Sequence, residues 1–252
     1  MSPDGGFAGP LPAIEGFLST AVLPSLGHLL DGGAEPLPWR RMAANLSARL
    51  DALPLHQSVA ALRALDPGGE RIEAICRAVL LPAAARLRAA HDPDALDQTA
   101  YLAALWRLRM CVVALDDIAA LSLPLPPPAG AILTLDPHLL APSLEHAVSA
   151  RFLARDGWAV HDCACGGAEE GCDSLNDDPF DAVWLSLDAE TDLARARTVA
   201  EQLRRASRNR RIRVLGGGTT DLPDVPAGAL GLDALTRDAT AASHLARRLA
   251  FA

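Results

Sequence analysis

The sequence predicts an α + α/β fold, in which a helical bundle is followed by a doubly wound parallel sheet. Two patterns lead to this expectation. Through residue 120, apolar side chains recur at helical spacing over long segments joined by short connections. After residue 130, short apolar segments alternate with amphipathic ones, as parallel strands do with their crossover helices. The proline-rich segment LSLPLPPPAG at 121–130 favours extended backbone, so we expect a linker there.

The bundle is expected over residues 1–120 and contains about four or five helices. These helices are predicted over residues 13–30, 38–53, 69–91 and 94–121. Pro38 stands at the start of the second segment, where proline is tolerated because its missing amide would have no helical partner. Asp94 is a candidate N-cap for the last segment.

The second unit is expected over residues 131–252. Strands are predicted over 131–135, 157–161, 182–187 and 212–217, and helices over 143–155, 190–207 and 239–251. Residues 161–172 are predicted to form an irregular surface loop. Ligands of doubly wound sheets bind at the carboxyl ends of the strands. Small and polar residues that suit such a pocket follow the predicted strands, namely Asp136, His138, Ser186, Gly216, Gly217 and Gly218.

Composition narrows the class of protein. The net charge is -8, and all 23 basic residues are arginine. An acidic balance disfavours an extended nucleic-acid surface but permits a local basic patch. No apolar run reaches the length of a membrane span, and no secretory leader is recognisable, so we expect a cytoplasmic protein without membrane contact. Five cysteines are more consistent with reduced thiols than with a disulfide framework.

Three segments of the second unit resemble the motifs of cobalamin-binding modules. That family carries Asp-x-His-x-x-Gly after its first strand, Ser-x-Leu at its third and Gly-Gly at its fourth. The corresponding residues here are Asp136-Pro137-His138-Leu139-Leu140-Ala141, Ser186-Leu187-Asp188 and Gly216-Gly217. The resemblance implies a flavodoxin-like, Rossmann-like cobalamin-binding domain that lies beside the helical bundle.

The resemblance also implies roles for these residues. His138 would be the axial cobalt ligand, and Asp136 would hold its other ring nitrogen. Ser186, Leu187 and the glycines 216–218 would line the slot for the nucleotide tail, where the backbone must approach closely. The hydroxo, methyl and adenosyl forms of cobalamin all remain open, and haem is the alternative cofactor.

The first motif departs from the family pattern. Ala141 replaces its glycine, and the distance from His138 to Gly157 is longer than the family spacing. His146, one turn into the next predicted helix, is therefore a rival cobalt ligand. The alternative interpretation is structural, since Asp-Pro sequences often form an ordinary turn that closes a strand. In the third-strand motif, Asp188 stands where an apolar residue is usual.

Residues 201–218 and 228–242 resemble the AerR/PpaA group of anti-repressors most closely, and the overall resemblance covers residues 70–252. It implies a light-responsive cobalamin-binding regulator of photosynthesis genes. Its partner would be a repressor of the CrtJ/PpsR type, with at most weak or indirect DNA contact. The cobalamin photoreceptors of the CarH and LitR type are similar but more distant.

Those photoreceptors cover the upper face of the cofactor with a tryptophan and a Glu-His pair from the bundle. Trp106 is the candidate tryptophan here, although a place in the bundle core is its alternative role. No matching Glu-His pair is found in the predicted bundle, residues 1–120. His28 could reach the upper face if its segment folds back over the sheet.

No nucleophile–base pair, phosphate-binding loop or carboxylate pair is recognisable at the predicted strand ends. We therefore expect a ligand-sensing regulator and not an enzyme. The alternatives are a corrinoid carrier of a methyltransferase system, and an interaction module of the same fold that binds haem or nothing.

Two further segments carry candidate chemistry. His161, Cys163, Cys165 and Cys172 could hold a soft metal or form a redox-sensitive thiol pair, but their spacing matches no common zinc motif. Residues 204–213 are rich in arginine. These arginines either complement a helix C-terminus or contact an acidic partner or a DNA backbone.

Overall fold

The computed structural model describes residues 53–65, 72–91, 98–122, 127–137, 143–163, 167–187, 192–218, 222 and 224–250, with the helical positions 41, 45 and 49. The predicted helix 13–30 and the candidate cap Asp94 lie outside the described residues. Within the predicted segment 38–53, Arg41, Asn45 and Arg49 are helical and exposed.

The helices that precede the sheet are α3 (Leu55–Leu65), α4 (Ile72–Ile75), α5 (Leu81–Ala90) and α6 (Gln98–Ser122). A π-helical turn, Cys76–Leu80, joins α4 to α5, so the predicted helix 69–91 is not a regular α-helix. Proline explains the irregularity, because Pro82 has no amide hydrogen and its ring crowds the preceding turn. The Leu81 amide instead donates to the Cys76 carbonyl, five residues back.

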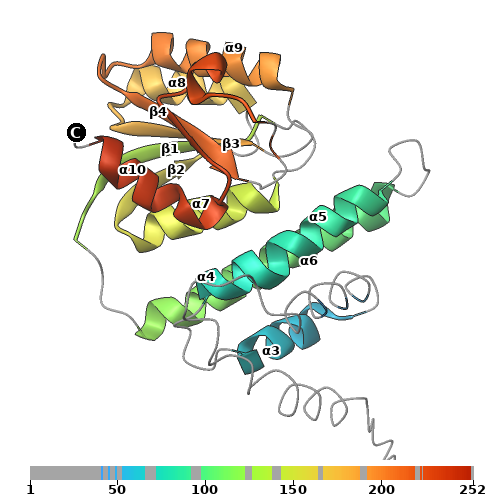
Figure 1. The fold of residues 1–252 in the computed structure, drawn as a ribbon. Coiled ribbons are helices and arrows are strands. Elements are labelled where there is room, and N and C mark those ends of the chain that lie inside the picture. The colour runs from blue at the N-terminus through green and yellow to red at the C-terminus, as the bar shows by residue number, and fades with distance from the viewer. Residues whose placement is uncertain are drawn as a thin grey trace, which may run out of the picture.

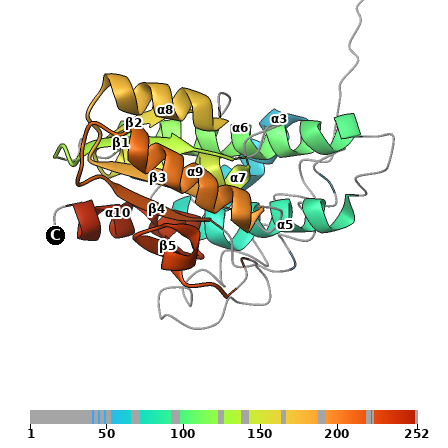
Figure 2. The ribbon, with the colours of Figure 1, turned by 90° about the horizontal axis from the view of Figure 1, so that it is seen from above.

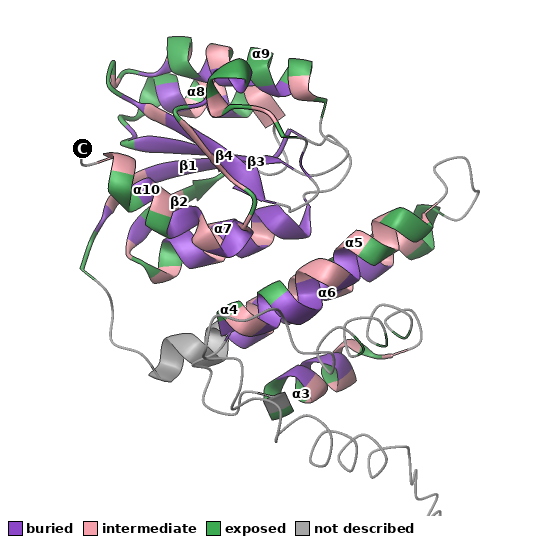
Figure 3. Cartoon of the chain, viewed as in Figure 1, coloured by how far each residue is buried: buried purple, intermediate pink, exposed green. Residues whose placement is uncertain are grey.

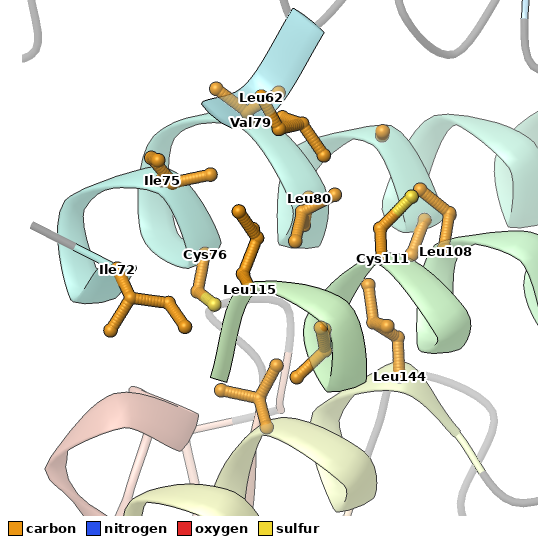
Figure 4. Packing of buried hydrophobic residues seen from close by; sticks show 14 of the residues in the cluster. Leu62, Ile72, Ile75, Cys76, Val79, Leu80, Leu108, Cys111, Leu115 and Leu144 are labelled. Atoms are coloured by element: carbon orange, nitrogen blue, oxygen red, sulfur yellow. The ribbon is translucent and has the colours of Figure 1, made fainter. Parts of the chain in front are cut away.

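One apolar cluster holds these helices together (Figure 4). Leu62 of α3, Val79 and Leu80 of the π-helical turn, and Leu108 of α6 are buried in it. Leu144, from the helix that follows β1, enters the same cluster. The bundle core therefore continues without a break into the second unit.

A five-stranded sheet forms the second unit, with the strand order β2-β1-β3-β4-β5. The strands are β1 (Gly130–Leu135), β2 (Trp158–Asp162), β3 (Ala182–Leu187), β4 (Arg213–Gly218) and β5 (Ala234–Thr236). Every neighbouring pair is parallel. The predicted doubly wound parallel sheet is thus confirmed. The proposed division into 1–120, 121–130 and 131–252 stays a prediction; α6 extends to Ser122.

Helices cover both faces of the sheet (Figure 1). On one face lie α8 (Gly167–Asp177) and α9 (Leu193–Ala206), and on the other lie α7 (Leu144–Arg155) and α10 (Ala242–Ala250). Successive residues of β1 point to opposite faces of the sheet. Leu133 packs in the core under α8 and α9, and Ile132 packs in the core under α7 and α10.

Part of the segment predicted as an irregular loop, 161–172, is regular structure. β2 extends through Asp162, one residue beyond the predicted strand, and α8 begins at Gly167. Tight packing explains the glycine inside this helix, because a Cβ atom on Gly171 would stand 2.7 Å from Leu135 Cδ1 and 3.0 Å from Leu203 Cδ2. A glycine at a close helix–sheet contact weakens the helical signal in the sequence.

Helix α7 lies between the sheet and the bundle (Figures 1 and 2). Leu153 packs toward the sheet, whereas Leu144 and Val148 pack toward the bundle. Burial on both sides is visible in Figure 3, where much of α7 is coloured as buried. A movement of the bundle would therefore act directly on α7. No helix in the described parts of the chain is long and apolar enough to cross a membrane.

Candidate functional site at the carboxyl edge of the sheet

The three segments that carry the sequence motifs meet at the carboxyl edge of the sheet. Asp136 directly follows β1, Ser186 lies near the end of β3, and Gly216 to Gly218 end β4. Chain order reverses between β1 and β3, and ligands of such sheets bind beside this reversal. His138 follows Asp136 by two residues but lies outside the described residues, so its predicted role as cobalt ligand stays a prediction.

His146, the rival ligand, is fully buried in α7 and bonded through both ring nitrogens. Nδ1 lies 2.9 Å from Ser186 Oγ, and Nε2 lies 2.7 Å from Asp162 Oδ1. An ionised carboxylate only accepts, so Nε2 donates to Asp162, and in the neutral ring Nδ1 accepts the Ser186 hydroxyl proton. This arrangement leaves His146 without a ring nitrogen to offer a metal.

Asp136 stabilises the start of α7. Its Oδ2 accepts hydrogen bonds from the Ser143 amide at 2.6 Å and the Ser143 hydroxyl at 2.8 Å. Ser143 Oγ in turn accepts the His146 amide at 3.1 Å, as an N-cap residue does. The buried carboxylate therefore has a structural function, and this favours the turn-closing alternative for Asp136. Its predicted contact with His138 stays a prediction.

The glycines of β4 pack tightly against the chain itself. Gly217 has φ 145°, and a Cβ atom there would overlap the Thr236 carbonyl. A Cβ atom on Gly218 would stand 2.6 Å from the Leu187 carbonyl oxygen and 3.0 Å from Glu145 Cβ. Close approach explains these glycines, but the approaching atoms belong to β3, β5 and α7, and the predicted contact with a nucleotide tail stays a prediction. Leu187 is buried in the sheet core.

Ser186, His146 and Asp162 form a hydroxyl–imidazole–carboxylate chain that the sequence did not reveal. The three residues come from β3, α7 and β2, and their spacing follows no motif. Such a chain is the arrangement that activates a nucleophilic serine. Ser186 is only 1% exposed, however, so its hydroxyl is sealed from substrate in this arrangement. The chain acts here as a polar bridge between three elements, with Ser186 and His146 buried and Asp162 exposed at the surface.

Two arginines connect the bundle to this edge. Arg88 of α5 forms a two-point ion pair with Glu145 of α7, with Nη2–Oε1 at 2.6 Å and Nη1–Oε2 at 3.1 Å. Arg77 contacts Asp238 at 3.1 Å and Thr240 Oγ1 at 2.8 Å, just beyond β5. Both arginines therefore contact residues near the carboxyl ends of the strands.

The predicted upper-face residues are not part of this site as described. Trp106 is 56% exposed on α6, so its predicted alternative place in the bundle core is wrong. It lies about 100° around the helix from Leu105 and about 160° from Leu108, which do enter that core. His28 lies outside the described residues, and its role stays a prediction.

The cysteine segment contains no metal site among the residues that the structure describes. Cys165 is outside these residues. Burial raises the pKa of the Cys163 thiol to about 11, and it also raises the pKa of Cys172. Thiols with raised pKa values are poor nucleophiles at neutral pH.

An acidic hollow of about 460 Å³ lies beside this segment and is lined by His161 and the outer face of α8.

The arginine-rich segment lies at the opposite, amino edge of the sheet, between the end of α9 and the start of β4. Arg204 and Arg213 both pair with Asp233, and Arg205 pairs with Glu201. The turn after α9 is held by Asn209, whose side chain donates to the Phe180 carbonyl and accepts the Arg211 amide. Three of the six arginines in residues 204–213 thus form ion pairs that serve the local structure.

No protein-family model matches the sequence. A search of curated proteins also gave no match. Two solved structures are similar over most of their length. The methanol:cobalamin methyltransferase complex MtaBC of Methanosarcina barkeri gives a TM-score of 0.44 at 11% identity, covering 94% of this chain and 92% of that chain. A cobalamin-binding protein of Desulfitobacterium hafniense DCB-2 gives a TM-score of 0.41 at 15% identity. This match covers 95% of this chain and 98% of that chain. At these scores, neither match assigns a ligand or a reaction to this chain.

Whether the described edge could hold cobalamin depends on two features. Ser186 and Asp136 stand at the β1/β3 reversal, where ligands of such sheets bind, although both side chains are buried and hydrogen-bonded within the chain. The corner beside Gly218 is filled by Glu145, however, and both nitrogens of His146 are engaged. In this arrangement, the described residues do not form an open slot for the cofactor.

Proposed function

We propose that this protein is a cobalamin-binding regulator that senses its ligand at the carboxyl edge of the sheet. The observation that carries the proposal is the convergence of Asp136, Ser186 and Gly216–Gly218, which belong to three separated sequence motifs, on one strand edge. Bound cobalamin would supply a coloured cobalt centre whose axial ligands respond to light. His138, in the connection from Asp136 to α7, is the proposed axial ligand.

The regulatory part of the proposal rests on the place of α7. This helix carries His146 and Glu145 at the edge and also packs in the bundle core through Leu144 and Val148. A change at the edge can therefore shift the balance between two positions of the bundle. The sealed Ser186 hydroxyl supports a sensor more than an enzyme.

The proposed partner is a repressor of the CrtJ/PpsR type. Arg208, Arg210 and Arg211 are exposed at the amino edge and form no ion pair with the described residues. These side chains would contact an acidic surface of the partner, far from the ligand, with at most indirect contact to DNA. Gel filtration of the mixed proteins, in darkness and after illumination, measures whether the complex depends on light.

An absorption spectrum tests cobalamin binding directly. The protein is mixed with hydroxocobalamin, separated from free ligand by gel filtration, and compared with His138→Ala and His146→Ala. We expect the wild type to retain corrin absorption and His138→Ala to lose the shift caused by an axial imidazole. A wild-type protein without corrin absorption would contradict the proposal, and a parallel titration with haemin would then test the haem alternative.

A corrinoid carrier is the competing function with the same cofactor. The two functions differ in what happens to a methyl group on cobalt. Incubation of the methylcobalamin-loaded protein with a thiol acceptor and its methyltransferase in the dark would move the methyl group if the chain is a carrier. A regulator would keep its methyl group in the dark and change partner affinity on illumination.

A further inference from the structure

The Arg88–Glu145 ion pair is buried between the bundle and the α/β unit. Side-chain exposure is 8% for Arg88 and 1% for Glu145. The two terminal guanidinium nitrogens each donate to a different oxygen of the Glu145 carboxylate, and this bidentate geometry is among the stronger forms of ion pair. Removing one partner of a buried ion pair is costly, because the charge that remains loses its closest counter-ion.

Glu145 also fills the corner of the strand edge. Its Cβ and Cγ atoms lie 3.0 and 3.4 Å from where a side chain on Gly218 would begin. Gly218 ends β4, one of the strands whose sequence motif predicts a ligand slot. The space beside Gly218 is therefore taken by the Leu187 carbonyl, 2.6 Å from the same position, and by the stem of Glu145.

Arg88 holds Glu145 in this position from the bundle side. Arg88 lies on α5, near the end of the helix, while the rest of α5 and the π-helical turn pack in the bundle core. Moving Glu145 away from Gly218 must break the ion pair or carry α5 along with it. The position of Glu145 beside Gly218 and the position of the bundle are thus linked through the ion pair.

We propose that the Arg88–Glu145 pair is an autoinhibitory latch. In the closed state, it fastens α5 to α7 and keeps the strand-edge corner filled. Ligand entry beside Gly218 requires the pair to open, and opening frees the bundle from α7. Because linkage is reciprocal, whatever loosens the bundle also raises the affinity of the edge for its ligand. The ligand part of this inference rests on the function proposed above.

Hydrogen exchange followed by mass spectrometry tests the latch without any ligand. The variants are Arg88→Gln, Glu145→Gln and the charge reversal that combines Arg88→Glu with Glu145→Arg. We expect amides of residues 81–90 and 144–148 to exchange about tenfold faster in each single variant and to recover at least partly in the charge reversal. Arg197→Gln, which removes the exposed ion pair with Glu201, is the matched control and should leave these amides unchanged.

The same proteins are then mixed with hydroxocobalamin, and dissociation constants are measured by absorption. The latch predicts that Arg88→Gln and Glu145→Gln bind hydroxocobalamin with dissociation constants about fivefold lower than that of the wild type. Their association rates should be no lower than the wild-type rate. Unchanged exchange in both single variants would overturn the latch, whatever the corrin result. Faster exchange with unchanged corrin affinity would overturn its autoinhibitory role. If exchange is faster in the single variants but neither the wild type nor any variant binds hydroxocobalamin, the proposed function is overturned. The role of the ion pair in holding α5 against α7 would still stand.

Discussion

The Nδ1 atom of His146 lies 2.9 Å from the hydroxyl oxygen of Ser186, although forty positions of sequence separate the two residues. The contact joins α7 to the end of β3, and the other ring nitrogen joins α7 to Asp162 of β2. One buried side chain thus fixes how the helix sits against two strands at the candidate edge.

Replacing this histidine should destabilise the fold. His146→Ala removes both hydrogen bonds and leaves a cavity, so we expect the free energy of unfolding to fall by about 2–4 kcal/mol. Ser186→Ala should cost about 1–3 kcal/mol, because Nδ1 then lacks a partner. Urea unfolding measures both, with the exposed His244→Ala as control. Equal stability of the histidine variant and its control would show that the buried bridge is not structural.

The backbone at the end of β4 should tolerate no side chain. Gly217 has φ 145° and no room for a Cβ atom beside the Thr236 carbonyl, so Gly217→Ala should lower the free energy of unfolding by about 3 kcal/mol or more. Gly228→Ala is the matched control, since a Cβ atom there meets nothing within 4 Å. Thermal unfolding followed by circular dichroism compares them. A similar midpoint for both variants would contradict the close approach of β4 and β5.

Two buried cysteines should resist thiol reagents in the folded protein. Burial raises the pKa of Cys111 to about 12 and that of Cys163 to about 11, from the ordinary value of 9.0. At pH 8, Ellman's reagent should therefore react slowly with both until denaturant is added. Mass spectrometry of the labelled peptides identifies the sites. Rapid labelling of Cys163 in the native protein would restore the redox interpretation.

The same thiols should make the fold less stable at high pH. Their folded-state pKa values are raised, so the stabilisation from keeping them protonated is complete below pH 9 and is lost as pH rises through about 11 and 12. Urea unfolding between pH 8 and pH 11 measures the loss. In Cys163→Ala, the free energy of unfolding should fall less steeply with pH. If its dependence on pH is the same as in the wild type, other groups cause the decline.

Trp106 should contribute little to folding. Its side chain is 56% exposed, so Trp106→Ala should change the free energy of unfolding by no more than about 0.5 kcal/mol. Trp184→Ala, at a fully buried position of β3, should cost about 3–5 kcal/mol. If Trp106→Ala weakens retention of hydroxocobalamin without affecting stability, the predicted lid role gains support. A large loss of stability would instead place Trp106 in an apolar contact.

The order of strands and helices in the second unit was predictable because each element carries its own local signal. The strands are short apolar runs, and α9 has clear amphipathic spacing with Asp192 as N-cap. The local signal failed where tertiary contact decides the conformation. Helix α8 contains Gly171, which disfavours a helix in isolation but is required by the contact with Leu135. Likewise, Pro82 lies inside the predicted helix 69–91, and a proline alone does not specify a π-helical turn.

The candidate site was predictable in part. Residues at strand ends can be located from the sequence, because parallel strands place their carboxyl ends together. The hydrogen-bond partners of Asp136 and His146 could not be predicted from the sequence. Ser143, Asp162 and Ser186 become their neighbours only once α7 is packed on the sheet. The exposure of Trp106 was missed for a related reason, since α6 is apolar on both faces and the sequence does not say which face is covered.

The burial of Trp184 has an optical consequence. Its indole lies fully buried in β3, two positions before Ser186, so it stands about 7 Å along the strand from the candidate edge. A dry indole of this kind emits at short wavelength, and any coloured molecule bound at the edge would accept its excitation energy. The chain thus contains its own fluorescent reporter, and the difference between wild type and Trp184→Phe would isolate the signal without an added dye.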